Sequence, residues 1–178
     1  LKALVKESRR PDGPLRAKQA LAEVGIPLVV EPHLSQTFLD GAAFLHQGRP
    51  VVGLTLRYDR TDNFWFVLIH ELEHVTRHLH EGRVEDIFDD LDAEGDALER
   101  ETDELAGQVL IPEDRWETAL ARYVRSEQSV EDFAQELGVS PALVAGRIRK
   151  EADNYAILTG LVGQGEVRKY FPGVVFGQ

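Results

Sequence analysis

The sequence of 178 residues contains no cysteine and no methionine, and it has no apolar run long enough to cross a membrane. Without cysteine the chain can form neither a disulfide nor a thiolate metal site. No secretory signal is visible either, so we expect a cytoplasmic protein without a membrane partner. Because the chain starts at Leu1 and lacks methionine altogether, we expect it to be part of a longer product.

The charge is strongly one-sided, with a formal net value of −11. This acidity argues against a main nucleic-acid-binding surface, and we expect no direct binding of nucleic acid by this chain. Acidic residues are densest at 85–96, a segment that reads as a solvated loop. The alternative is that one of Asp89, Asp90 or Asp92 hydrogen-bonds a metal-binding imidazole.

The most informative pattern is His70-Glu71-Leu72-Glu73-His74, an H-E-x-x-H motif that follows the apolar run 64–69. Four residues turn a helix by about 400°, so His70 and His74 lie on one face and can hold one metal ion. Glu71 lies about 100° away, where it can act as a general base toward water. The alternative is a pair of core histidines that are satisfied by hydrogen bonds.

A catalytic zinc site needs a third protein ligand. Residues 97–112 read as a helix that stops before Pro112, with an apolar stripe at helical spacing. Glu101 lies on this stripe, three residues after Leu98 and four before Leu105. A carboxylate that faces the core needs a partner or a metal. We therefore predict that His70, His74 and Glu101 bind Zn²⁺, with Mn²⁺ or another divalent ion as alternatives.

Two histidines that follow the motif are alternative third ligands. His80 lies six residues after His74, where the metzincin pattern places its third histidine, but Arg77 stands where that pattern has glycine. His78 is four residues after His74, too far along the axis of a straight helix. The other polar residues of the second helix are expected to be solvated: Glu99, Arg100 and Asp103.

Together, residues 70–74 and 101–112 resemble the ImmA/IrrE metallopeptidases, whose pattern is H-E-[LIF]-[GA]-H followed by E-A-[ND]-x-F-A-x-x-L-L-[MI]-P. The match falls on Glu101 as the ligand carboxylate. The departures of the chain from the pattern include Glu73, Thr102 and Leu105. Residues 25–30, 39–42 and 53–66 resemble the branch that is fused behind helix-turn-helix regulators of the HigA antitoxin type.

The resemblance implies a zinc-dependent endopeptidase of a transcriptional regulatory, toxin–antitoxin or stress-response system. Its substrate would be a helix-turn-helix repressor or antitoxin, in trans or as the missing N-terminal domain of the same chain. The alternative is a catalytically silent, metal-binding sensory domain of a DNA-binding antitoxin. A third possibility is that residues 128–150, which look like a helix-turn-helix, read DNA through Arg147, Arg149 and Lys150.

The expected fold is α+β and zincin-like, with a small β-sheet packed on the H-E-x-x-H helix and a C-terminal helical bundle. We place the metallopeptidase core at 1–112 and a helical subdomain packed on it at 113–178. Strands are expected at 28–30, 42–46 and 51–56, the last as the edge strand that holds an extended substrate. Helices are expected at 14–24, 96–110, 113–124, 128–137 and 141–150, and Thr61 or Asp62 should cap the active-site helix. Five side chains could stabilise the transition state: Arg57, Tyr58, Arg60, His78 and His80.

Overall fold

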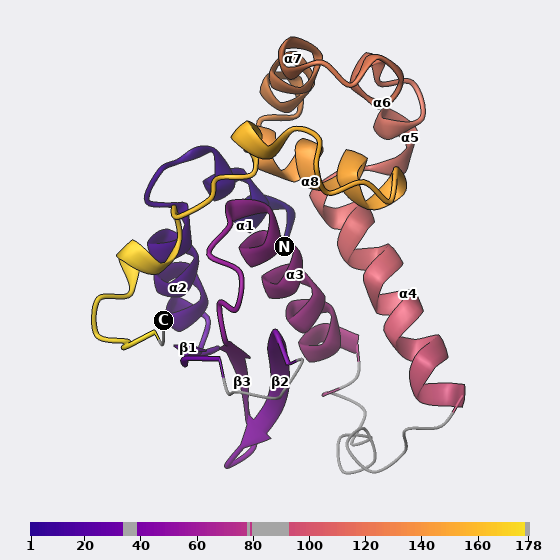
Figure 1. Cartoon of the computed structure of the whole chain (residues 1–178). Coiled ribbons are helices and arrows are strands. Elements are labelled where there is room, and N and C mark those ends of the chain that lie inside the picture. The colour runs from indigo at the N-terminus through magenta and orange to yellow at the C-terminus, as the bar shows by residue number, and fades with distance from the viewer. Residues whose placement is uncertain (34–38, 78, 80–92, 177–178) are drawn as a thin grey trace.

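The computed structural model describes residues 1–33, 39–77, 79 and 93–176. Its described part is α+β, with one three-stranded sheet and eight α-helices (Figure 1). The predicted α+β class is confirmed. The strands are β1 (Leu28–Val30), β2 (Gly41–His46) and β3 (Arg49–Leu54). The helices are α1 (Lys2–Val5), α2 (Gly13–Glu23), α3 (Thr61–Arg77), α4 (Ala93–Leu110), α5 (Glu113–Trp116), α6 (Leu120–Val124), α7 (Glu127–Leu137) and α8 (Pro141–Glu151).

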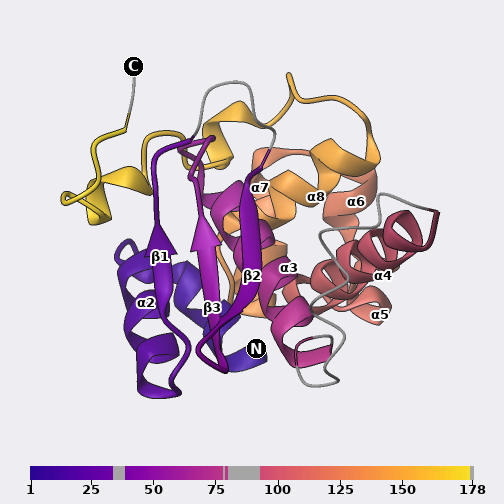
Figure 2. The same ribbon diagram turned by 90° about the horizontal axis from the view of Figure 1, so that it is seen from below.

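The sheet has the order β1-β3-β2, with β1 parallel and β2 antiparallel to β3. A two-residue turn joins β2 to β3, and positive φ angles at Gln47 (51°) and Gly48 (76°) are those of a type I′ hairpin. The prediction that residues 51–56 form the edge strand is wrong, because β3 lies in the centre. Its apolar side chains are buried, whereas β2 is exposed along its second half and forms an edge beside α3 (Figure 2).

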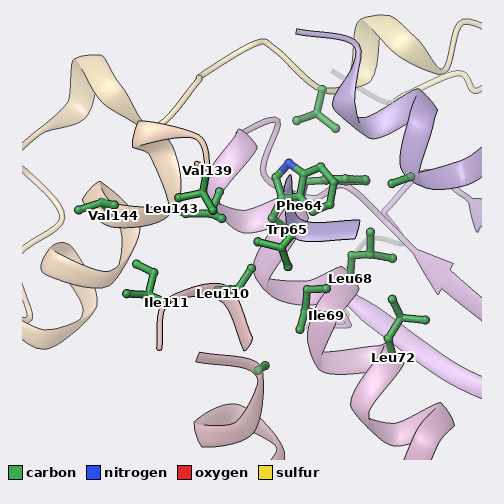
Figure 3. Close-up of a cluster of buried hydrophobic side chains, with 14 of the residues drawn as sticks. Phe64, Trp65, Leu68, Ile69, Leu72, Leu110, Ile111, Val139, Leu143 and Val144 are labelled. Carbon is green, nitrogen blue, oxygen red and sulfur yellow. The ribbon is translucent and has the colours of Figure 1, made fainter. Parts of the chain in front are cut away.

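Helix α3 forms the centre of the molecule because apolar side chains recur every three or four residues along it. Five of them are almost completely buried: Phe64, Trp65, Leu68, Ile69 and Leu72. In Figure 3 they lie in one cluster with side chains from the end of α4 and from the α7–α8 pair. One apolar core therefore continues from the sheet and α3 into the C-terminal helices.

The start of α3 differs from the expectation of a side-chain cap. Thr61 is the first residue of the helix, and its backbone N–H donates to the carbonyls of Val162 and Gly163. The N–H of Asp62 also lies within reach of the Val162 carbonyl, at 3.4 Å. Carbonyls of the C-terminal segment thus satisfy donors that a cap residue would otherwise bind. Among the helices of the described ranges, none is both long and apolar enough to cross a membrane.

The helix expected at 113–124 is instead two short helices, α5 and α6. The chain between them becomes extended at Ala119 (φ −68°, ψ 126°), which ends helical hydrogen bonding there. Trp116 at the end of α5 is fully buried, and its indole N–H donates to Glu151 at 2.6 Å. This aromatic anchor fixes α5 against α8.

Helices α7 and α8 match the expected helix pair closely, with Ser126 and Ser140 as N-caps. The basic side chains of α8, however, interact with other groups of the chain. Arg147 donates to the Ile111 carbonyl at 2.9 Å, and Arg149 is only 4% exposed. Lys150 forms an ion pair with Asp103 of α4. The expectation that this chain does not bind nucleic acid directly stays a prediction.

Candidate metal centre

The two histidines of the H-E-x-x-H motif lie on one face of α3, as their spacing predicts. The ring centroids of His70 and His74 are 4.8 Å apart, and their Nε2 atoms are 3.1 Å apart. Both side chains are largely buried, with 13% and 9% of their surfaces exposed. The Nε2 atoms of the two imidazoles therefore face the same position beside the helix.

Glu99 of α4 brings a carboxylate to this point. Its Oε2 lies 3.0 Å from His70 Nε2, and its Oε1 lies 3.2 Å from His74 Nε2. A tetrahedral zinc ion with bonds of about 2.05 Å has ligand atoms about 3.3 Å apart, close to these separations. Two imidazoles and one carboxylate are also a donor set that zinc accepts. The described residues thus fit a divalent metal, held by His70, His74 and Glu99.

Glu101, the carboxylate expected here, lies elsewhere on α4. It is exposed and does not belong to the cluster that the described residues form around His70 and His74. The expectation took the larger apolar residues as the inner face, but Leu98, Leu105 and Val109 are only partly buried. The fully buried side chains facing α3 are smaller, Thr102 and Ala106, and they are followed by Leu110. The inner face of α4 is therefore rotated from the predicted one, and it presents Glu99 rather than Glu101 to the two histidines.

Asp103, expected to be solvated, instead orients His70. Its Oδ1 lies 3.0 Å from His70 Nδ1, so the imidazole can donate there and keep Nε2 free for a metal. Glu99 and Asp103 are four residues apart on α4 and therefore share one helix face. This E-x-x-x-D spacing, opposite an H-E-x-x-H helix, was the signal that could have identified both residues from the sequence.

The electrostatics of the metal-free site follow from these contacts. Burial lowers the pKa of His70, but hydrogen bonds to Asp103 and Glu99 outweigh burial and raise it to about 9. Hydrogen bonds to His70 and His74 hold the pKa of Glu99 well below its ordinary value. Without metal, the carboxylates therefore keep a proton on His70. A bound cation would replace that proton, because metal-binding histidines are neutral.

Glu71 lies on the sheet side of α3. Its carboxylate is buried, with 6% of the residue exposed, and it accepts a hydrogen bond from the backbone N–H of Ala43 in β2. Burial raises the pKa of Glu71 to about 7, against the opposing charges of His70 and His74. This residue is therefore a basic group at the metal centre, anchored by the edge strand.

The side chains that could stabilise the transition state stay predictions. Arg57, Tyr58 and Arg60 precede α3, and both arginines stack on the Tyr58 ring. Arg60 directly precedes α3, about 15 Å of helix before His70 at 1.5 Å per residue. Several other candidates fall outside the described residues: His78, His80, Asp89, Asp90 and Asp92.

A small mixed sheet beside a helix with two histidines and a buried glutamate, completed by a carboxylate from the next helix, defines a metallopeptidase-like class of protein. The chain belongs to the family of the IrrE N-terminal-like domain, peptidase family M78, whose model matches residues 23–149. This match confirms the resemblance to the ImmA/IrrE peptidases, whereas the HigA-fused branch stays a prediction. No curated protein matches the sequence significantly.

Proposed function

We propose that this chain is a zinc-dependent endopeptidase. The observation that carries the proposal is the convergence of His70, His74 and Glu99, whose donor atoms lie 3.0–3.2 Å apart. Zinc bound there would polarise a peptide carbonyl and activate water for attack. Membership of a peptidase family supports the same reaction class.

The residues of the chain would act around that metal in distinct roles. Glu71 would take a proton from the attacking water and deliver it to the leaving amine. The Ala43 N–H holds its carboxylate in place, so the base does not depend on substrate for its orientation. Asp103 would keep His70 in the tautomer that leaves Nε2 for the metal.

Strand β2 is the natural place for the substrate backbone. It forms the edge of the sheet beside α3, with only β3 as its partner among the described strands. An edge strand offers unpaired N–H and C=O groups to an extended peptide. A substrate aligned there would run past Glu71, because Ala43 on the same strand contacts that carboxylate. Folded helices hide their carbonyls, so cleavage should fall in an exposed linker or loop.

We infer further that the substrate is a cytoplasmic helix-turn-helix repressor or antitoxin, in trans or attached to this chain. The support is the family resemblance together with the net charge of −11, which would attract a basic DNA-binding partner at long range. The competing role is that of a silent sensor, which would bind metal and regulate without cleavage.

The test combines metal analysis with cleavage of a candidate regulator. Purified protein should hold about one zinc ion per chain, the stoichiometry of a single three-ligand site. The fragments of a metal-loaded reaction are then identified by mass spectrometry. Glu71→Gln should keep the metal and the fold but lose cleavage by orders of magnitude. A metal-free wild type, or equal cleavage by Glu71→Gln, would reject the proposal. Unchanged regulation by Glu71→Gln in cells would favour the sensor.

A further inference from the structure

Lys150 of α8 reaches the metal centre from the C-terminal helices. Its Nζ lies 2.9 Å from Asp103 Oδ2 and 4.5 Å from the centroid of the Phe66 ring. Phe66 is one helical turn before His70, and the two rings are 6.3 Å apart. One ammonium group thus contacts both the carboxylate that orients His70 and the helix that carries it.

The two oxygens of Asp103 are divided between these partners. Oδ1 faces His70 Nδ1 at 3.0 Å, while Oδ2 faces Lys150 at 2.9 Å. A carboxylate held at one oxygen loses the freedom to turn its other oxygen away from the imidazole. Preorganised partners of this kind lower the ordering cost of binding.

We propose that Lys150 is a positioning residue of the metal centre, which acts through Asp103 on His70. The inference rests on the proposed metal site and adds a residue from a helix that the H-E-x-x-H pattern does not include. An exposed Lys–Asp pair contributes little stability by itself. Its effect is on the orientation of a ligand, so it should be measured as metal affinity.

The direction of the change in metal affinity on loss of Lys150 distinguishes a positioning role from charge repulsion alone. A lysine near a cation repels it, so on charge alone the loss of Lys150 would tighten metal binding. Loss of a positioning contact would weaken it. Removal of an outer partner of a metal ligand costs roughly 10–100-fold in affinity, and Lys150 is one contact further out, so we expect about a three- to tenfold loss.

The experiment compares zinc affinity, by chelator competition, for the wild-type chain and three variants. Lys150→Met should weaken zinc binding about three- to tenfold. Lys150→Arg should bind zinc like the wild type, because it keeps a cation beside Asp103. The matched control is Lys169→Met, because Lys169 is also an exposed lysine with an ion pair, to Glu166, and an aromatic contact, 5.4 Å from Tyr170. The control should bind zinc like the wild type.

A double-mutant cycle then tests the route through Asp103. Asp103→Asn should lower zinc affinity, and Lys150→Met should have no further effect in that background. Visible absorption of the Co²⁺-loaded chain should change in Lys150→Met and recover in Lys150→Arg, because it reports ligand geometry. Unchanged or tighter zinc binding by Lys150→Met, or additive effects in the cycle, would overturn the inference alone. A wild type that binds no zinc would overturn the proposed function as well.

Discussion

Gly41 lies against Glu71 so closely that no side chain fits between them. A Cβ atom on Gly41 would be 2.7 Å from Glu71 Oε1 and 2.6 Å from the Cγ1 atom of Val67. Gly41 is the first residue of β2, the strand whose Ala43 N–H holds the same carboxylate. The edge strand and the proposed general base are therefore fitted to each other directly.

Replacement of this glycine should damage catalysis without removing the metal. In Gly41→Ala the added methyl group must displace Glu71 or β2, and a misplacement of about 1 Å can cost on the order of 100-fold in rate. We expect kcat/KM to fall by about that factor while zinc content stays at the wild-type level. Gly53→Ala on the adjacent strand is the matched control, because its Cβ would meet nothing closer than 3.8 Å. Equal losses in both variants would contradict the fit described.

The identity of the third ligand is open to a direct test. Glu99→Ala should weaken zinc binding by more than roughly 100-fold, beyond the usual cost of losing an outer partner. Glu101→Ala should bind zinc like the wild type, because that side chain is exposed and lies outside the cluster. Equilibrium dialysis with elemental analysis measures both. If Glu101→Ala empties the site and Glu99→Ala does not, the arrangement of α4 is wrong.

The contrast between α3 and α4 shows how much of the candidate site could be predicted from the sequence. The face of α3 could be predicted, because the histidines and the large apolar residues repeat at helical spacing within one segment. The apolar pattern does not give the face of α4, because closely packed helices bury small side chains such as Thr102 and Ala106, and only the E-x-x-x-D spacing points to it. Apolar size then points to the wrong face, and with it to Glu101.

Contacts between residues far apart in the sequence are the second part of the structure that could not be predicted. The hairpin of β2 and β3 has a local turn signal at Gln47-Gly48, but the place of β1 depends on a parallel pairing with no local signal. That pairing makes β3 central and leaves β2 as the edge. The contact of Lys150 with Asp103 spans 47 positions of sequence and likewise required the packed structure.

The metal-free chain should lose stability as the pH rises above neutrality. The pKa of His70 is raised from 6.5 to about 9 in the fold, so its protonated form stabilises the native state. This contribution is complete below pH 6.5 and is lost as the pH rises through about 9. Glu71, whose pKa burial raises to about 7, loses its proton at the lower end of this window, and its contribution to stability falls with rising pH in the same direction.

Urea unfolding of the chelator-treated protein between pH 6 and 9.5 measures this dependence. His70→Asn should flatten the curve, whereas His46→Asn, on an exposed strand residue, should leave it unchanged. Zinc should reverse the slope, because it competes with the proton on the histidines. A metal-free wild type whose stability rises across this range would contradict the assignment.

The crossing of α8 over the start of α3 depends on a second close approach. A Cβ on Gly146 would lie 2.9 Å from the Cβ of Asp62, a buried residue that also forms a bidentate ion pair with Arg60. Gly146→Ala should therefore lower the free energy of unfolding by about 1–3 kcal/mol, the usual cost of overpacking. Gly107→Ala is the opposite case, since this α4 position has open space around a Cβ. It should stabilise the chain by roughly 0.5–1 kcal/mol through helix propensity. Equilibrium urea unfolding of the metal-free variants measures both changes, and effects of the same sign would show that α8 does not cross α3 at Gly146.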